Sequence, residues 1–302
     1  MSLSEKEFLE NYDYTKFDRP SIAADIVIFA VMTDQADEGK VRDSENLRKL
    51  PPRKLKVLLI KRGEHPFKDK YALPGGFVRK DEDVYDAASR ELYEETHVKQ
   101  SYLELMDVYS KKGRDPRGWI MSNTFMALVD GRKCNLKADS DAGEARWFDL
   151  TMEEKPLKNE CKTDSVTKVT EYRLTLISED GTEKMEPVVT MESKFENFHE
   201  KISVKKYDGD GIAFDHGIII LRTLLGLQEK VRSDAKIIFD FMPEYFTYAE
   251  LQEAFELVLG VKLTTPNFRR KIKDYCVETD KMLEGAGHRP AALFVRNLEM
   301  FR

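Results

Sequence analysis

The stretch of sequence from residue 76 to residue 98 constrains this chain more than any other feature. It reads GFVRKDEDVYDAASRELYEETHV. Glu91, Glu94 and Glu95 stand at i, i+3 and i+4, so a helix places all three on one face. Like charges at this spacing cost roughly 0.2–0.5 kcal/mol per pair in an isolated helix, and a hard cation with oxygen ligands reverses that cost. The pattern therefore predicts a helix with a divalent metal site.

An apolar stripe lies beside this acidic face. Val84, Ala88 and Leu92 stand at i, i+4 and i+8, which predicts that they dock the helix and leave the carboxylates at the rim of a cleft. The alternative is a solvated amphipathic helix that is merely rich in acidic residues. A glycine, an upstream glutamate and an arginine at fixed offsets from the three glutamates argue against that alternative.

These residues resemble the Nudix box, with Gly76, Glu82 and the run from Arg90 to Glu95 at its glycine and charged positions. The resemblance implies a hydrolase that cleaves diphosphates linked to a nucleoside with the help of Mg²⁺ (or Mn²⁺). By the same resemblance ADP-ribose is the expected substrate. Water would attack one phosphorus and release AMP and a phosphorylated sugar.

The resemblance also assigns catalytic and metal-binding roles within the helix. Glu91 and Glu95 are expected to hold the metal, and Glu94 is expected to hold the metal or to act as the general base. Arg90 and Glu82 are expected to orient their neighbours, because a guanidinium fixes a carboxylate by charge-assisted hydrogen bonds.

One position departs from the family pattern. His97 stands where the family has a glycine that ends the helix with a positive φ. Histidine tolerates that backbone region better than most other residues, so we expect an altered helix end with the metal ligands intact upstream. The substitution bears on catalytic efficiency more than on metal binding.

Runs of aliphatic and β-branched residues predict a sheet around this helix. The predicted strands cover residues 22–31, 55–61, 71–78, 103–109 and 119–129, with a short strand at 145–148. This order resembles the Nudix α/β/α sandwich, and we expect a Nudix domain over residues 1–233. Residues 151–209 hold two strand-like runs around a turn at residues 179–181, which predicts a β-hairpin insertion, with a disordered linker as the alternative. Residues 212–231 predict a long helix, with His216 as a structural residue at its start rather than a ligand.

A second module follows over residues 234–302. Thr247 and Glu250 form a capping-box pattern at one helix start, and Thr265 marks the start of a second, basic helix. With the Gly/Arg/Pro segment at residues 285–295, this module resembles a winged helix. A Nudix domain followed by such a module resembles the transcriptional regulators of NAD and sugar metabolism. The resemblance implies contacts with duplex DNA, for which the basic candidates are Arg269, Arg270, Lys273 and Arg289. The alternative is a packing or dimerisation domain with a solvated basic face.

A loop between two predicted strands supplies candidate substrate contacts. It reads GRDPRGW, and we expect Arg114 or Arg117 to grip phosphates while Trp119 stacks on a base. Arg62 and Gly76 are further candidates for the substrate site. The alternative is that the Asp-Pro pair forms an ordinary turn and that Trp119 belongs to the core.

Composition limits the classes of function. The net charge of −6 argues against a uniformly basic coat for nucleic acid but leaves room for a local patch. Three widely spaced cysteines form neither a zinc pattern nor a disulfide framework, which favours a reducing cytoplasm. No apolar run is long enough to span a membrane, and the polar N-terminus does not resemble a signal peptide.

Two functions stay open on the sequence. The retained glutamates favour a hydrolase. The alternative is a ligand-sensing, DNA-binding transcriptional regulator whose Nudix domain binds ADP-ribose or a related metabolite. The two roles can coexist in one chain, and in either case we expect a homodimer.

Overall fold

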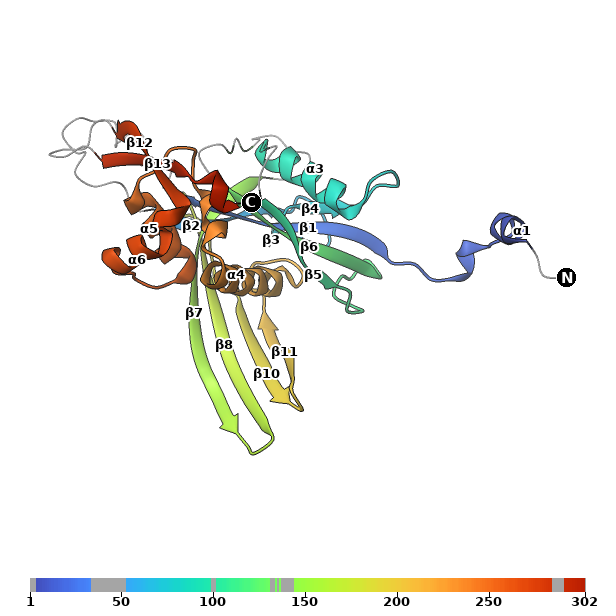
Figure 1. Ribbon diagram of the computed structural model, residues 1–302. Coiled ribbons are helices and arrows are strands. Elements are labelled where there is room, and N and C mark those ends of the chain that lie inside the picture. The colour runs from blue at the N-terminus through green and yellow to red at the C-terminus, as the bar shows by residue number, and fades with distance from the viewer. Residues whose placement is uncertain are drawn as a thin grey trace.

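The computed structural model describes residues 4–33, 53–98, 102–130, 134, 136, 144–283 and 291–301. One large sheet organises most of them, with the strand order β11-β10-β8-β7-β2-β1-β6-β5 (Figure 1). Its strands are β1 (Ser21–Met32), β2 (Lys54–Lys61), β3 (Tyr71–Ala72), β4 (Gly75–Phe77), β5 (Tyr102–Tyr109), β6 (Ile120–Val129), β7 (Ala145–Cys161), β8 (Ser165–Ser178), β9 (Lys184–Met185), β10 (Val188–Glu196) and β11 (His199–Asp208). The short strands β3, β4 and β9 pair with β2, β1 and β8.

The middle of this sheet is covered on both faces. β1 is buried over all but its first two residues, because its side chains alternate between two hydrophobic clusters. Helix α3 (Val84–Thr96) covers one face, and helix α4 (His216–Ser233) covers the other. The expected docking stripe is confirmed, since Ala88 and Leu92 are buried and Val84 packs against the same cluster. The predicted α/β/α sandwich is therefore present.

Four strands extend beyond the sandwich as a blade formed by β7, β8, β10 and β11 (Figure 1). The expected hairpin is confirmed as the pair β8 and β10, with Gly181 at φ 69° in the turn after β8. The expected short strand at residues 145–148 is wrong, because β7 continues to Cys161 and pairs with β8. The outer half of β7 is polar and exposed, so its sequence carries no apolar alternation that would have marked it as a strand.

The C-terminal module is a winged helix, as expected. Its elements are η3 (Ala235–Phe241), α5 (Tyr248–Leu259), α6 (Thr265–Ile272), η4 (Lys273–Tyr275), β12 (Cys276–Leu283), β13 (Ala291–Arg296) and η5 (Leu298–Phe301). β12 and β13 pair antiparallel, and a bridge from Phe246 to Phe294 adds a third short backbone segment to this wing.

The caps of the two helices in this module explain where they begin and end. Thr247 Oγ1 accepts a hydrogen bond from Glu250 N at 3.1 Å, and Glu250 Oε2 accepts one from Thr247 N at 2.7 Å, so the capping box is confirmed. Gly260 ends α5 in the left-handed region at φ 66°. The N-cap of α6 is Thr264 and not the expected Thr265, which shifts the start of that helix by one residue.

The two modules share one hydrophobic core. Phe239 and Phe255 of the winged helix belong to the same buried cluster as Leu59 of the central sheet. At the end of α4, Gln228 Nε2 donates to the backbone oxygen of Val258 in α5 at 3.0 Å, and this contact is buried. The winged helix is therefore fixed to the sandwich through α4, and also through Arg53, which pairs with Glu250 and Glu253 of α5.

Ahead of β1 lies a segment that stands apart from the rest. It contains α1 (Glu5–Glu10) and η1 (Tyr14–Lys16), and Figure 1 shows α1 well clear of the sandwich. Every residue from 4 to 19 is exposed. Neither these short helices nor any other described helix is long and apolar enough to cross a membrane.

Candidate ligand pocket and Nudix helix

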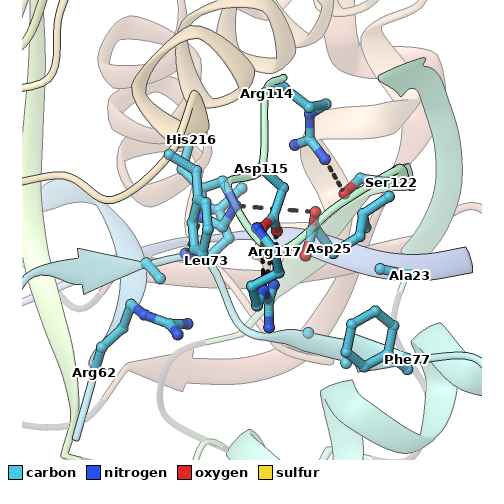
Figure 2. Close-up of a pocket in the computed structure, with 15 residues that line it drawn as sticks. Ala23, Asp25, Arg62, Leu73, Phe77, Arg114, Asp115, Arg117, Ser122 and His216 are labelled. Atoms are coloured by element: carbon cyan, nitrogen blue, oxygen red, sulfur yellow. Dashed lines mark hydrogen bonds and ion pairs between the residues drawn. The ribbon is translucent and has the colours of Figure 1, made fainter. Parts of the chain in front are cut away.

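A pocket of about 210 Å³ opens near the start of β1 (Figure 2). Its wall comes from β1, β4, the loop between β5 and β6, and the segment that leads into α4. That loop contains the GRDPRGW segment, which supplies Arg114 and Arg117. Arg62, which follows β2, reaches the same pocket. Arg62, Arg114 and Arg117 all line the pocket, and so does Gly76.

Arg114 is held at the inner wall by a fork of hydrogen bonds. Its Nε and Nη2 donate to the two carboxylate oxygens of Asp215 at 2.9 and 2.7 Å, and its Nη1 donates to Ser122 Oγ at 2.7 Å. Only 5% of the Arg114 side chain is exposed. Asp215 is the N-cap residue of α4, yet it makes no side-chain capping bond to the helix. The reason is that Arg114 engages both of its carboxylate oxygens.

Arg117 and Arg62 both lie close to one aromatic ring, that of Phe214. The guanidinium carbons of Arg117 and Arg62 lie 5.4 and 5.0 Å from the ring centroid of Phe214. Arg117 Nη2 also donates to Asp115 Oδ2 at 2.7 Å, while Arg62 Nε donates to the backbone oxygen of Pro66. Burial lowers the pKa of Arg62, and the charge of Arg117 lowers it further. A bound anion would relieve this repulsion between the two cations.

His216 joins the pocket to the sheet. Its Nδ1 accepts a hydrogen bond from Leu73 N at 2.9 Å, and burial lowers its pKa, so the ring is held neutral. This contact fits the expected structural role at the start of α4. Asp25 lies opposite, with its Oδ2 4.0 Å from His216 Nε2, and sequence reasoning missed it. A lone carboxylate inside the apolar run IAADIVIFAV was the signal that could have identified Asp25.

Trp119 lies elsewhere. It is not among the described residues that line the pocket, and 48% of its surface is exposed. The alternative that Trp119 belongs to the core is wrong, and its stacking on a base stays a prediction. Phe77 and Phe214 are the aromatic side chains at the pocket.

The Nudix helix α3 is organised around Arg90. Its Nε and Nη2 donate to Glu82 at 3.0 and 2.7 Å, and its Nη1 donates to Glu91 at 2.6 Å and reaches Glu94 at 3.4 Å. These bonds agree with the expected orienting role of Arg90 and Glu82. Hydrogen bonds from Arg90, and then from the backbone of Arg79, lower the pKa of Glu82 to about 2.

Gly76 lies so close to the Glu91 carboxylate that a larger residue would not fit. A Cβ atom at Gly76 would lie 2.2 Å from Glu91 Oε1, closer than real atoms approach. The glycine therefore lets the carboxylate lie against the backbone of β4. Burial raises the pKa of Glu91, while the bond from Arg90 opposes that rise. The spacing between glycine and glutamate in the motif thus has a direct steric cause.

The expected metal site is not assembled in this arrangement. Glu91 and Glu94 bond to Arg90, and Glu95 is buried with 5% of its surface exposed. Within the described ranges, no three His, Cys, Asp or Glu side chains are grouped so that they could hold a metal ion. The donor atoms suit Mg²⁺ or Mn²⁺, but their arrangement does not fit the ion, because Arg90 would first have to release Glu91 and Glu94.

The helix end is not altered as expected, although His97 departs from the family pattern. His97 has φ 56° and ψ 15°, the left-handed conformation that the family glycine adopts easily. Its backbone N–H donates to Tyr93 O at 2.9 Å, and its ring packs edge-on against the ring of Tyr93. His97 therefore replaces the glycine at some backbone cost without shortening α3.

The candidate DNA contacts lie on the outer side of the winged helix. Arg269 and Arg270 in α6 and Lys273 in η4 are exposed, and none forms an ion pair with an acidic side chain of the described chain. Arg270 Nη2 donates to Asn267 Oδ1 at 2.7 Å, which holds it on the helix surface. Arg289 lies outside the described residues.

Two domain families match this chain. Residues 50–167 match the NUDIX domain, and residues 238–295 match the NrtR DNA-binding winged helix domain. Among curated relatives, the "ADPR responsive transcriptional repressor NtrR" of Acinetobacter baylyi is 29% identical over 294 residues, covering 96% of this chain and 88% of the relative. An "ADP-ribose pyrophosphatase" of Methanocaldococcus jannaschii is 50% identical over 95 residues, covering 32% of this chain and 55% of that enzyme. The chain thus matches about half the length of the pyrophosphatase.

Solved structures support the same two-module architecture. A MutT/nudix family protein from Enterococcus faecalis aligns with a TM-score of 0.62 at 26% identity, covering 98% of this chain and 94% of that chain. NrtR from Shewanella oneidensis aligns with a TM-score of 0.57 at 23% identity, covering 91% of this chain and 94% of that chain. At that identity the second likeness concerns the fold alone.

Proposed function

Because this chain is a Nudix-domain protein with a C-terminal winged helix of the NrtR type, we propose that it is a DNA-binding transcriptional regulator. Its Nudix domain binds ADP-ribose or a related nucleoside diphosphate derivative, and the bound ligand changes its affinity for duplex DNA. The observation that carries the proposal is the ion pair from Arg114 in the pocket to Asp215 at the start of α4, since α4 ends against the winged helix.

The pocket has the chemistry for a diphosphate. Arginine offers planar, bidentate donors to phosphate oxygens, and three arginines line this cavity. Phe77 and Phe214 provide apolar surface for a sugar or base beside them. The cavity of about 210 Å³ is smaller than the ~300–1,000 Å³ of typical ligand sites, so the diphosphate fits inside and part of the ligand lies at the mouth. The repressor from A. baylyi, whose name describes it as ADPR responsive, supports ADP-ribose as the ligand.

A ligand phosphate and Asp215 compete for Arg114. When phosphate takes the guanidinium, Asp215 is released and gains the usual partner of an N-cap carboxylate, the free N–H groups of the first turn of α4. The helix start then has two alternative bonding arrangements. At its other end, α4 is bonded to α5 through Gln228. A ligand shifts DNA affinity only through such a difference between two states.

On the DNA side, α6 is the recognition element of this proposal. Its exposed arginines fit phosphate oxygens and base edges in the major groove. Winged-helix and related regulators read two half-sites as dimers, so the proposal includes a homodimer that acts in the cytoplasm.

The test is a titration of duplex fragments from around the protein's own gene, at two salt concentrations, with and without ADP-ribose. We expect sequence-dependent binding that ADP-ribose changes severalfold. Replacing both Arg269 and Arg270 with Ala should weaken binding and lower the salt slope by roughly 1 for each DNA phosphate that an arginine no longer neutralises. The matched control replaces Lys201 and Lys206 on the exposed blade with Ala and should leave DNA binding unchanged. Binding that ignores both sequence and ligand would refute the regulator.

Hydrolysis is the second candidate. It is favoured by the complete set of charged residues in the Nudix box and by 50% identity over 95 residues to an ADP-ribose pyrophosphatase. The test is incubation with ADP-ribose and Mg²⁺, with and without EDTA, while AMP is measured. A hydrolase should release AMP only with the metal, and Glu94→Gln should reduce that release by orders of magnitude. If AMP does not form, the Nudix domain acts by binding alone.

A further inference from the structure

Asp25 is a buried carboxylate that receives no hydrogen bond from its own chain. It lies on β1 in the row of side chains that continues as Val27 and Phe29 in the hydrophobic cluster beside α4. Only 8% of its surface is exposed. Within the described part of the chain no group donates to its oxygens, and its one ion-pair contact is the 4.0 Å approach to His216 Nε2. Burying a carboxylate without a donor is unfavourable, so a ligand that brings a donor into this pocket binds more tightly.

The neighbouring strand leaves room for this carboxylate at the pocket wall. Asp25 pairs with Gly75 across β1 and β4, and both residues line the pocket. A Cβ atom at Gly75 would lie 2.9 Å from Asp25 Oδ1 and 2.4 Å from the backbone oxygen of Ala24. A side chain at position 75 would therefore displace the carboxylate from the place that it occupies.

His216 presents a hydrogen-bond donor to the same space. Its Nδ1 accepts from Leu73 N, and burial lowers the pKa of the ring, so the one proton of the neutral ring lies on Nε2. Among the described residues this N–H has no acceptor within hydrogen-bond reach, since Asp25 Oδ2 is 4.0 Å away. A donor and an acceptor thus face each other across a gap that is too wide for a direct hydrogen bond (Figure 2).

A single hydroxyl group fits this gap. An oxygen that lies ~2.8 Å from both atoms makes an angle of about 90° between its two hydrogen bonds, which suits a hydroxyl that accepts one bond and donates the other. A diphosphate oxygen has no proton to donate, and the carboxylate repels it. This end of the pocket therefore suits a sugar hydroxyl, while the arginines suit the diphosphate.

The opposite end of the pocket is where a base can lie. Phe77 is 46% exposed, and its ring lies 5.4 Å from the guanidinium carbon of Arg117. Figure 2 shows Phe77 across the pocket from His216, which is only 6% exposed. A cavity of about 210 Å³ does not enclose a whole nucleoside diphosphate sugar. The base therefore stays at the mouth beside Phe77, and the end of the ligand that carries no base enters toward Asp25.

We infer that Asp25 and His216 bind a hydroxyl of the distal sugar, the ribose that carries no base, and so select a nucleoside diphosphate sugar over a plain nucleoside diphosphate. This inference rests on the proposed function and adds the ligand group that the buried end of the pocket recognises. A site built to pair with a hydroxyl discriminates strongly against a ligand that lacks it, because its polar groups then stay buried and unpaired. ADP-ribose should therefore bind at least about tenfold more tightly than ADP.

The experiment is a calorimetric titration of the full chain with ADP-ribose and with ADP, in EDTA so that hydrolysis does not consume the ligand. Asp25→Asn keeps the shape of the side chain and removes its charge, and thermal unfolding verifies that this variant folds. The ratio of the ADP to the ADP-ribose dissociation constant should fall by about tenfold in this variant. The matched control is Asp115→Asn, a carboxylate of the same pocket that holds Arg117. It should weaken both ligands by the same factor, so the ratio should not change.

A third ligand, inosine diphosphate ribose, separates recognition of the sugar from recognition of the base. Hypoxanthine exchanges the donor and the acceptor on the edge of adenine, so the parent should bind this ligand as tightly as ADP-ribose if Asp25 and His216 contact only the sugar. A parent that binds ADP and ADP-ribose equally, an Asp25→Asn variant with an unchanged ratio, or a preference for adenine that Asp25→Asn removes would each overturn the inference and leave the regulator proposal standing. A parent that binds none of the three ligands would overturn both.

Discussion

Helices α3 and α4 cover opposite faces of the same sheet, yet they use charge in different ways. In α3, one guanidinium is shared by Glu82, Glu91 and Glu94, and all four groups lie within the motif. At α4, Arg114 and Asp215 pair one to one across 101 residues of sequence. The charges of α3 are satisfied within their own neighbourhood. The pair at α4 instead ties the candidate pocket to the helix that contacts the winged module.

The residues that identify the family are therefore not the ones through which we propose that the ligand acts on DNA binding. The motif on α3 identifies the Nudix domain, and its geometry is local. α4 has no motif, but it touches both the pocket through His216 and the winged helix through Gln228. If the protein is a regulator, changes at α4 should alter how ligand controls DNA binding, and changes at α3 should not.

The largest effect is expected from Arg114→Ala. It leaves Asp215 without its partner near the pocket wall, and breaking a buried ion pair lowers the free energy of unfolding by about 3 kcal/mol. It also removes a guanidinium that we propose binds a phosphate of the ligand. Arg117→Ala is the matched control in the same loop. Its side chain is 42% exposed, and Asp115 would keep the hydrogen bond from the backbone N–H of residue 117, so its removal should cost less than that of Arg114 while still weakening ADP-ribose binding. Urea denaturation and ligand titration measure both quantities, and equal losses of stability would show that the Arg114 pair is not special.

A smaller effect is expected from Gln228→Leu. The buried oxygen of Val258 loses its donor, which should lower the free energy of unfolding by about 1–3 kcal/mol. DNA should still bind, but the change in DNA affinity caused by ADP-ribose should shrink severalfold. On α3, Glu94→Gln is the control and should leave that change intact. Fluorescence anisotropy with a labelled duplex compares the two variants. If Glu94→Gln reduces the effect of ADP-ribose and Gln228→Leu does not, the ligand acts on DNA binding through α3 and not through α4.

Acid should weaken the fold through His216. Burial lowers its folded pKa below the unfolded value, so the unfolded chain binds more protons and stability falls as the pH drops below about 6.5, by at most about 1.4 kcal/mol per pH unit. The carboxylates of Asp25 and Asp215 oppose this shift, while Arg114 and Arg62 reinforce it. Unfolding curves between pH 7 and pH 5 should be flatter for His216→Asn than for the parent. If the stability of the two proteins falls equally as the pH is lowered, another group causes the loss of stability in acid.

The smallest effect is expected at the end of α3. His97→Gly removes a side chain from a left-handed position at φ 56° and should raise the free energy of unfolding by about 0.5–1 kcal/mol. Ligand-controlled DNA binding should not change. Calorimetry gives the stability, and a clear loss would show that the ring contact with Tyr93 outweighs the backbone strain.

Sequence reasoning was accurate where the determinants are close along the chain. The docking stripe of α3, the capping box at Thr247 and the left-handed residue at the end of α3 are all set by contacts within one helix. It failed at β7 because the outer half of that strand is polar and obtains its partners from β8. It missed Asp25 at the pocket, because the place of that side chain does not depend on local pattern.

The sequence by itself determined the Nudix helix, the two-module order and the helices of the winged module, since helical periodicity and capping act over three or four residues. Only the tertiary structure decided which charges meet. It paired Arg114 with Asp215, and it left Glu91 and Glu94 bonded to Arg90 in an arrangement that does not hold a metal. The partner of a charged side chain is whichever opposite charge the fold brings within about 3 Å, and the chain folds without regard to how far apart those two residues lie in the sequence.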